Sequence, residues 1–306
     1  MLELRRILCA VDFTDVSARA LAYAASTARW YGAGLRVLHV VPSVIEADMF
    51  PSLAPDPPSS AATGLKGGAE FRAAAERFVR RAAAQAPDCA LVVREDADVA
   101  DAIIGEAEAT RPDLLILGTE SRSMVGRLLH RSVAETVMRR VSCPVMIVPA
   151  GAARPVPAGD VQFDSVLCAL DLSDGSSAPC RYAVSLAEEA DATLVLLNVI
   201  EVPPEAQVHE EGVTISAVGA AAHAARLGRL RAQVTAESRP FFRLETMVED
   251  GNPSRVILET AAGHASDLIV LGGRHRSAID RFFFGSTTDA VLQGAQCPVL
   301  VVHQAN

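Results

Sequence analysis

Short apolar runs alternate with amphipathic segments along the whole chain. Uninterrupted apolar runs predict buried strands at 6–11, 35–41 and 90–94, and again at 165–170, 193–199 and 243–248. Apolar residues at helical spacing predict helices over 18–31, 69–86 and 99–109, and again over 178–190, 216–238 and 254–262. Asp15 or Ser17 is the expected N-cap of the first helix, and Gly32 and Gly34 are expected to end it. Strands that alternate with helices in this way predict a parallel, doubly wound α/β sheet.

The pattern is present twice. The segment from Asp113 to Val148 and the segment from Asp267 to Val302 share one layout: strand, long loop, helix, then a Cys-Pro pair before another strand. Their starting residues are 154 positions apart (267 minus 113). A repeat unit of this size predicts two tandem domains rather than a solenoid, and we assign them to residues 1–150 and 161–306, with a linker at 151–160.

Composition and charge narrow the class of protein. The 306 residues suit two domains, and a hydrophobic content of 50% with only 5% aromatic residues predicts aliphatic cores. A net charge of −9 argues against binding to nucleic acid or to an anionic membrane. Neither a signal peptide nor a membrane-spanning run is recognisable, so we expect a cytoplasmic protein.

The six cysteines predict neither a disulfide framework nor a metal site. The sequence has no CxxC motif and no Cys/His cluster with zinc spacing. Cys9 with Cys168, and Cys143 with Cys297, form repeat-related pairs in or beside predicted strands. We therefore expect these four thiols to be buried and structural.

The chemistry is expected at one edge of each sheet. Asp12 and Asp171 follow the first strand of each copy, and in the second copy Gly285-Ser286-Thr287 opens a helix after a long loop. Ligands of doubly wound sheets bind at the carboxyl ends of the strands, and the free amides of a helix N-terminus favour phosphate. By itself, however, an aspartate after a strand is more often a turn former or helix cap.

At these residues the chain resembles the universal stress protein family, over essentially its full length. Nucleotide-binding members carry a glycine, two residues, a second glycine, nine residues, and then Gly-Ser or Gly-Thr. The second copy has Gly272, then His275 in the middle position, then Gly285-Ser286. The first copy has Gly118, Ser121 and Arg131-Ser132 at the same spacing.

The resemblance implies two Rossmann-like domains of the adenine nucleotide alpha hydrolase type, each a five-stranded, mostly parallel sheet flanked by helices. It implies a ligand that is ATP or another adenine nucleotide, with or without Mg²⁺, at the strand ends. Carried over by position, the nucleotide-binding residues are Asp171, Val199, Gly272, Arg274, His275, Gly285, Ser286 and Thr287, with a weaker counterpart in Asp12, Val40, Gly118 and Ser132.

Two substitutions within the motif leave alternatives open. His275 replaces a glycine, and its side chain either blocks the site or donates to a phosphate oxygen. Arg131 replaces a glycine that a positive φ would explain, so we expect the first site to be degraded. Arg274, Arg276 and Arg281 either add positive charge near the phosphates or form a solvated face.

The sequence alone leaves three possible functions open. The one we favour is a stress-response regulator that binds an adenine nucleotide and changes its contacts with an unidentified protein partner. The others are a nucleotide-free interaction protein and a slow ATP hydrolase. The only lysine is Lys66, so there is no Walker P-loop, and there is no GxSxG or HExxH motif. Family dimers imply that the two copies pair through 145–148 and 299–302, and that two chains form a homodimer.

Overall fold

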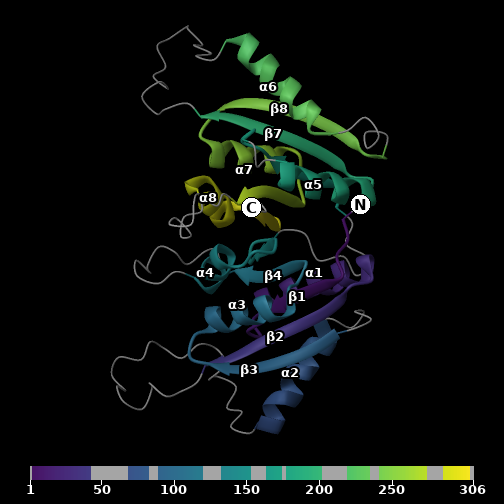
Figure 1. Cartoon of the computed structure of the whole chain (residues 1–306), viewed down its shortest axis with the longest axis vertical. Coiled ribbons are helices and arrows are strands. Elements are labelled where there is room, and N and C mark those ends of the chain that lie inside the picture. Colours follow the sequence, from purple (N-terminus) through teal and green to yellow (C-terminus); the bar gives the residue numbers. More distant parts are fainter. Residues whose placement is uncertain are drawn as a thin grey trace, which may run out of the picture. The chain divides into compact units, whose positions relative to one another are not determined.

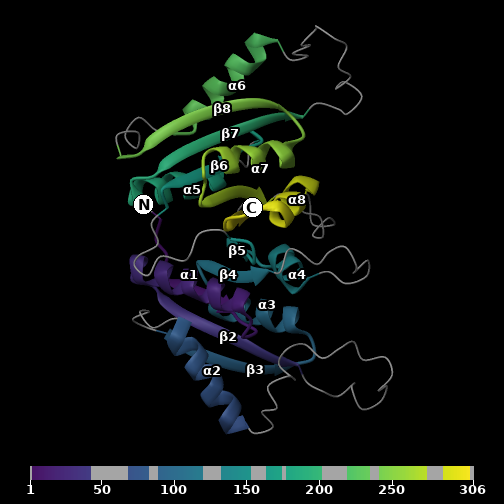
Figure 2. The same cartoon turned by 180° about the vertical axis from the view of Figure 1, so that it is seen from behind.

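The computed structural model describes residues 2–42, 68–82, 89–119, 132–152, 163–173, 177–201, 219–234, 241–273 and 285–303. The chain divides into two compact units, which consist chiefly of Glu3–Ala150 and Gln162–Asn306. Figures 1 and 2 show both units from opposite sides. The segment 43–67 and all but the first two residues of the predicted linker lie outside the described residues.

The N-terminal unit alternates strands and helices from its start. Its elements are β1 (Arg6–Ala10), α1 (Asp15–Tyr31), β2 (Gly34–Pro42), α2 (Gly68–Ala82), β3 (Cys89–Asp96), α3 (Val99–Thr110), β4 (Leu114–Thr119), α4 (Val133–Arg140) and β5 (Val145–Pro149). Their order in the sheet is β3-β2-β1-β4-β5, and each neighbouring pair is parallel.

The C-terminal unit repeats this order. Its elements are β6 (Ser165–Ala169), α5 (Ser177–Ala190), β7 (Thr193–Glu201), α6 (Ala220–Ala232), β8 (Arg243–Gly251), α7 (Pro253–Gly263), β9 (Leu268–Gly273), α8 (Ser286–Gly294) and β10 (Val299–His303). The parallel order β8-β7-β6-β9-β10 confirms the doubly wound α/β fold. Strand order reverses between β6 and β9, which is where such sheets open to ligands.

Most of the predicted elements are confirmed, and the differences lie at element ends: β7 and β8, for example, continue to Glu201 and Gly251, beyond the predicted ends at 199 and 248. The N-cap of α1 is Thr14 rather than Asp15 or Ser17, and the Thr14 hydroxyl accepts a hydrogen bond from the amide of Ser17 over 3.2 Å. Gly32 ends α1 with a φ of 62°, as predicted. The helix predicted over 216–238 is shorter, because α6 runs only from Ala220 to Ala232.

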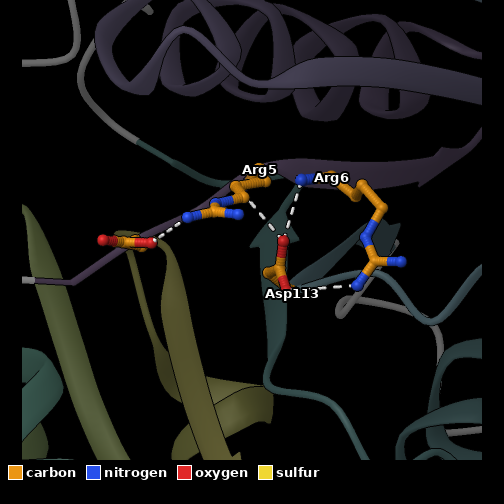
Figure 3. A network of polar contacts seen from close by, with 4 residues as sticks. Arg5, Arg6 and Asp113 are labelled. Carbon is orange, nitrogen blue, oxygen red and sulfur yellow. Dashed lines mark hydrogen bonds and ion pairs between the residues drawn. The ribbon is translucent and has the colours of Figure 1, made fainter.

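Two repeat-related aspartates fix the start of the first strand in each unit. Asp113 Oδ2 accepts from the amides of Arg5 and Arg6, both over 2.9 Å (Figure 3). Asp267 Oδ2 accepts from the amide of Asp164 over 2.8 Å, and its Oδ1 accepts from that of Ser165 over 3.3 Å. Each carboxylate therefore joins the beginning of β4 or β9 to the beginning of the central strand beside it.

The cores are aliphatic, as the composition predicts, and they contain most of the cysteines. Cys9, Cys168 and Cys297 are buried, whereas Cys143 is half-buried. Burial raises the pKa of Cys9 and Cys168, and it raises the pKa of Cys297 to about 12. A thiol whose pKa is raised in this way carries little thiolate at neutral pH, so these cysteines act as small apolar residues.

One buried ion-pair cluster was not predicted. Glu106 on α3 is 1% exposed, and its two carboxylate oxygens face Arg36 Nη1 at 3.1 Å and Arg94 Nη2 at 2.5 Å. A buried carboxylate needs such partners because its desolvation is costly. The cluster ties α3 to β2 and to the edge strand β3.

Within the described residues, no helix combines the length and apolarity needed to cross a bilayer.

Candidate functional site

A pocket of about 300 Å³ opens at the carboxyl ends of β6, β7 and β9 in the C-terminal unit. Five residues predicted from the sequence line it: Asp171, Val199, Gly272, Gly285 and Thr287. They come from four elements or their ends, far apart in sequence, and the doubly wound topology brings them to one rim. The pocket therefore lies where the strand order reverses.

The other predicted residues of this copy are placed differently. Ser286 is the first residue of α8 but does not line the pocket. Arg274 and His275 lie outside the described residues, as do Arg276 and Arg281. The alternatives for His275, blocking the site or donating to phosphate, therefore stay predictions.

Asp171 has a structural role in the wall of the pocket. Its Oδ1 accepts from the amide of Ser173 over 2.9 Å and from the Ser173 hydroxyl over 2.7 Å. In the first copy Asp12 Oδ1 accepts in the same way from the amide and the hydroxyl of Thr14, over 3.1 and 2.7 Å. Both aspartates thus form turns with their own backbone, which is the ordinary role of this residue type after a strand. Asp171 also lines the pocket.

The N-terminus of α8 presents unpaired amides at the pocket. Its N-cap is Gly285, and no side chain caps the helix. The amides of Thr288 and Asp289 already bond to the carbonyl oxygen of Gly285, over 2.9 and 3.4 Å. Among the described residues, the amides of Ser286 and Thr287 have no acceptor. Two free N–H groups at the positive end of a helix dipole favour an anion.

A hydroxyl adds to this end of the pocket. Thr288 is 7% exposed and lines the pocket. Its hydroxyl makes no hydrogen bond among the described residues, and it is not one of their fully buried unpaired side-chain atoms, so it is open to the pocket. A hydroxyl that is open to the pocket beside an uncapped helix end is a further donor for an anion.

The corresponding helix of the first copy is closed. Ser132 is the N-cap of α4, and its hydroxyl accepts from the amide of Glu135 over 3.1 Å. Glu135 also pairs with Arg139 over 2.9 Å within the helix. The hydroxyl expected to contact phosphate is therefore occupied by its own helix.

The absence of a side chain has different structural consequences at Gly118 and at Gly285. A Cβ on Gly118 would lie 3.0 Å from the carbonyl oxygen of Val16, so this glycine allows β4 to pack closely on α1. Gly285 has a φ of −59° and nothing within 4 Å of its Cβ position. The expectation that the glycine replaced by Arg131 needs a positive φ is therefore wrong, as its counterpart Gly285 shows. Any residue can adopt the backbone conformation of Gly285, and the position is distinguished by the open space beside it.

The remaining first-copy candidate is a buried strand residue. Val40 is 6% exposed, near the end of β2, and pairs with Arg94 of β3. It corresponds to Val199 near the end of β7, which pairs with Glu249 of β8. Among the first-copy candidates, Asp12 and Val40 thus have the same positions in the fold as their second-copy counterparts.

Sequence reasoning missed several residues of the pocket. Glu201 ends β7 two positions after Val199, and Pro253 and Ile257 belong to the first turns of α7. The signal for Glu201 was its strand: residues at alternate positions of a strand face the same side, so a predicted site at 199 implies a contact at 201. The helix after the third strand also reaches the rim, and it begins at the Gly-Asn-Pro turn at 251–253.

The described residues contain no group of three or more His, Cys, Asp and Glu side chains that could hold a metal ion. Asp171 and Glu201 are the carboxylates that line the pocket. A Mg²⁺ ion normally takes one or two protein carboxylates together with phosphate oxygens and water. The suggestion of Mg²⁺ with the nucleotide accordingly stays a prediction.

Comparison with known proteins gives one consistent family. The model of the universal stress protein family matches residues 3–149 and again 162–303. A universal stress protein of Mycolicibacterium smegmatis is 26% identical over 314 aligned residues, covering 97% of this chain and 96% of that protein. Universal stress protein Rv2005c of Mycobacterium tuberculosis is 27% identical over 199 residues, 63% of this chain and 62% of that protein.

A solved structure reproduces the fold. A universal stress protein from Archaeoglobus fulgidus superposes with a TM-score of 0.67 at 19% identity, and the match covers 98% of this chain and 97% of that one. Identity at this level supports the architecture of both units and carries no information about their ligands.

Proposed function

The chain belongs to the universal stress protein family, and on that premise we propose that its C-terminal unit is a regulatory module that binds an adenine nucleotide. The observation that carries the proposal is the combination, in one pocket, of the uncapped α8 N-terminus with the hydroxyl of Thr288, which makes no hydrogen bond among the described residues. Free amides and a hydroxyl are donors that suit phosphate oxygens. The nucleotide phosphates bind at α8.

Charge determines the direction in which the nucleotide lies. The strand-end side of the pocket includes Asp171, after β6, and Glu201, at the end of β7, both of which repel phosphate. Carboxylate oxygens accept hydrogen bonds from ribose hydroxyls and from exocyclic amines. The nucleoside therefore lies against the ends of β6 and β7, and the phosphates extend towards α8.

The backbone of Val199 supplies the contact with the base. The carbonyl oxygen of Leu197 accepts from the amide of Leu170, so the backbone groups of Leu197 point towards β6. Because successive residues of a strand alternate, the N–H and C=O of Val199 point to the same side. The β6 ladder ends at Ala169 and Leu197, so these groups lie beyond their neighbouring strand. One donor beside one acceptor matches the edge of adenine that carries N1 and N6.

The N-terminal unit has a different role in this proposal. Its α4 terminus is capped by Ser132, whose hydroxyl accepts from the amide of Glu135. The cap occupies the group that was expected to contact phosphate, so we propose one nucleotide per chain and an N-terminal unit that serves as an interaction scaffold. Binding to the folded C-terminal unit stabilises it by mass action, which links nucleotide concentration to the availability of its surfaces.

Calorimetric titration with ATP tests this site. Gly285→Arg is expected to abolish binding, with a loss of at least about a hundredfold, because the side chain enters a space with nothing within 4 Å of its Cβ. Gly263→Arg is the matched control: Gly263 ends α7, is exposed, also has open space at its Cβ position, and does not line the pocket. Unchanged affinity in a folded Gly285→Arg variant would refute the site.

A further inference from the structure

Three side chains connect helix α6 to the backbone on the nucleoside side of the pocket. Asn198, 1% exposed, donates from Nδ2 to the carbonyl oxygen of Leu170 over 2.7 Å. Its Oδ1 accepts from Arg226 Nη1 over 2.8 Å. Leu170 lines the pocket directly, and Asn198 precedes Val199, which lines it as well. Arg226, near the middle of α6, therefore reaches both strand ends through a single amide.

A second arginine of α6 holds the turn after β6. Arg229 Nη2 donates to the carbonyl oxygen of Leu172 over 2.5 Å. Leu172 has a φ of 59°, a left-handed backbone that a leucine adopts only when its surroundings enforce it, and its side chain is buried. The carbonyls on either side of Asp171 are thus both bonded, one to Asn198 and one to Arg229.

Few apolar contacts hold α6 itself. Leu230 is its only buried residue within the range Ala220–Ala232. By contrast, α5 has six buried residues, Pro179, Cys180, Ala183, Ser185, Leu186 and Ala187. An isolated helix of this length is marginal in water, and elements with few buried contacts open at a low free-energy cost. The polar bonds of α6 therefore contribute a large share of what keeps it in place.

We propose that Arg226 and Arg229 are positioning residues for the nucleoside side of the pocket, so that nucleotide binding and the stability of α6 are coupled. The ligand orders Asp171 and Val199, and the bonds through Asn198 and Leu172 transmit that order to α6. By reciprocity, a change that loosens α6 lowers the affinity for the nucleotide. This inference rests on the proposed nucleotide site and makes α6 the surface that reports its occupancy.

In the N-terminal unit, the turn after the central strand is held by a different kind of contact. There the corresponding turn residue, Phe13, also has a left-handed φ, 65°, but it is held by aromatic packing against His39 and Phe78 with ring centroids 4.3 and 5.0 Å away. His39 contacts the carbonyl oxygen of Val11 as Asn198 contacts that of Leu170. Among the described residues, arginines connect this turn with the following helix in the copy with the open helix terminus, whereas an aromatic side chain of α2 packs on the turn in the other copy.

Hydrogen exchange measured by mass spectrometry, with ATP titrations on the same full-length proteins, tests the coupling. In the wild type, ATP should slow exchange across 220–232, although no residue of α6 lines the pocket. In Arg226→Met/Arg229→Met, this remote protection should disappear and ATP affinity should fall about tenfold, with exchange at 169–173 faster even without ligand. Methionine retains the apolar stem of each arginine, which limits the loss of packing.

Arg231→Met is the matched control. Arg231 lies on the same helix but donates to the Thr246 hydroxyl of β8 over 3.3 Å, away from the pocket wall. It should leave both ATP affinity and the ATP-dependent protection of α6 at wild-type values. Persistent protection of α6 in the double variant, or equal loss in Arg231→Met, would overturn the coupling while leaving the site intact. A wild-type chain that binds no ATP would refute the site itself, and the coupling with it.

Discussion

His39 and Asn198 make the same contact in the two units: each side chain bonds to the backbone carbonyl oxygen 28 positions before it, over 2.8 and 2.7 Å. The carbonyls belong to Val11 and Leu170, which follow the central strands β1 and β6. A carbonyl only accepts, so His39 must donate from Nδ1. The duplication has preserved this bond while changing the chemistry that makes it, and the change has consequences for pH.

The N-terminal unit should lose stability below about pH 6.5, the ordinary pKa of histidine. Burial lowers the pKa of His39 in the folded protein, so the unfolded chain binds the proton more readily. The stability that the N-terminal unit gains from a neutral His39 is fully present above pH 6.5, and it is lost as pH falls towards the lowered folded-state pKa.

Thermal unfolding followed by fluorescence of Trp30, the only tryptophan, reports this unit. His39→Asn, which copies Asn198, should flatten the pH dependence between 7.5 and 5.5. An equally steep dependence in that variant would assign the effect to another group.

Thr288→Val should weaken nucleotide binding without destabilising the protein. The hydroxyl has no partner among the described residues, so the isosteric change removes no bond from the free protein. One hydrogen bond to a charged oxygen contributes about 1.5–3 kcal/mol, which corresponds to roughly tenfold or more in ATP affinity. Thr110→Val, which removes a hydroxyl that bonds to the carbonyl oxygen of Glu106 over 2.8 Å, should show the reverse pattern. Calorimetry and thermal unfolding of both variants check this, and unchanged ATP affinity in Thr288→Val would contradict it.

Glu201→Gln should lower the affinities for ATP and for adenosine by similar factors of about ten. The carboxylate of Glu201 accepts hydrogen bonds from the nucleoside and does not contact phosphate. Glu249→Gln is the control: Glu249 is exposed on the neighbouring strand β8, outside the pocket lining. The two ligands are compared by calorimetry. A Glu201→Gln variant that bound ATP more tightly, with adenosine unaffected, would show that this carboxylate only repels phosphate and that the ligand direction is wrong.

Asn substitutions at the two anchoring aspartates should have unequal costs. Asp267 is 6% exposed and uses both oxygens as acceptors, so Asp267→Asn places an amide donor against a backbone N–H. Asp113 uses Oδ2 for both of its amides, so Asp113→Asn retains that geometry. We expect a loss of about 1–3 kcal/mol at 267 and less than about 1 kcal/mol at 113. Hydrogen exchange of β6 and β1 in urea measures the two values, and equal losses would contradict the argument.

The sequence predicted the fold because its signals are local and duplicated. Apolar runs, and the glycines Gly32 and Gly272 that end elements, predicted the strands, the helices and their order. The doubly wound topology then determined which strand ends would meet. What the sequence did not predict depends on contacts between distant side chains. The bond from Arg226 to Asn198 and the ion pairs of Glu106 with Arg36 and Arg94 have no signature in spacing, because helices pack on strands with many possible partners.

The state of each helix terminus was also beyond sequence reasoning. Both loops have a serine at the same motif position, Ser132 and Ser286, yet one caps its helix and the other lies inside the first turn. The difference is a shift of one residue in where the helix begins, with the N-cap at Ser132 in α4 and at Gly285 in α8. That shift closes the first terminus and leaves the second one open.

The most direct test of the account is the number of adenine nucleotides that one wild-type chain binds, measured by equilibrium dialysis against saturating ATP. An open α8 terminus and a capped α4 terminus predict one nucleotide per chain. Two per chain would contradict the assignment of the N-terminal unit as a closed site. None would contradict the central claim, and the uncapped helix with its buried threonine would then have no ligand.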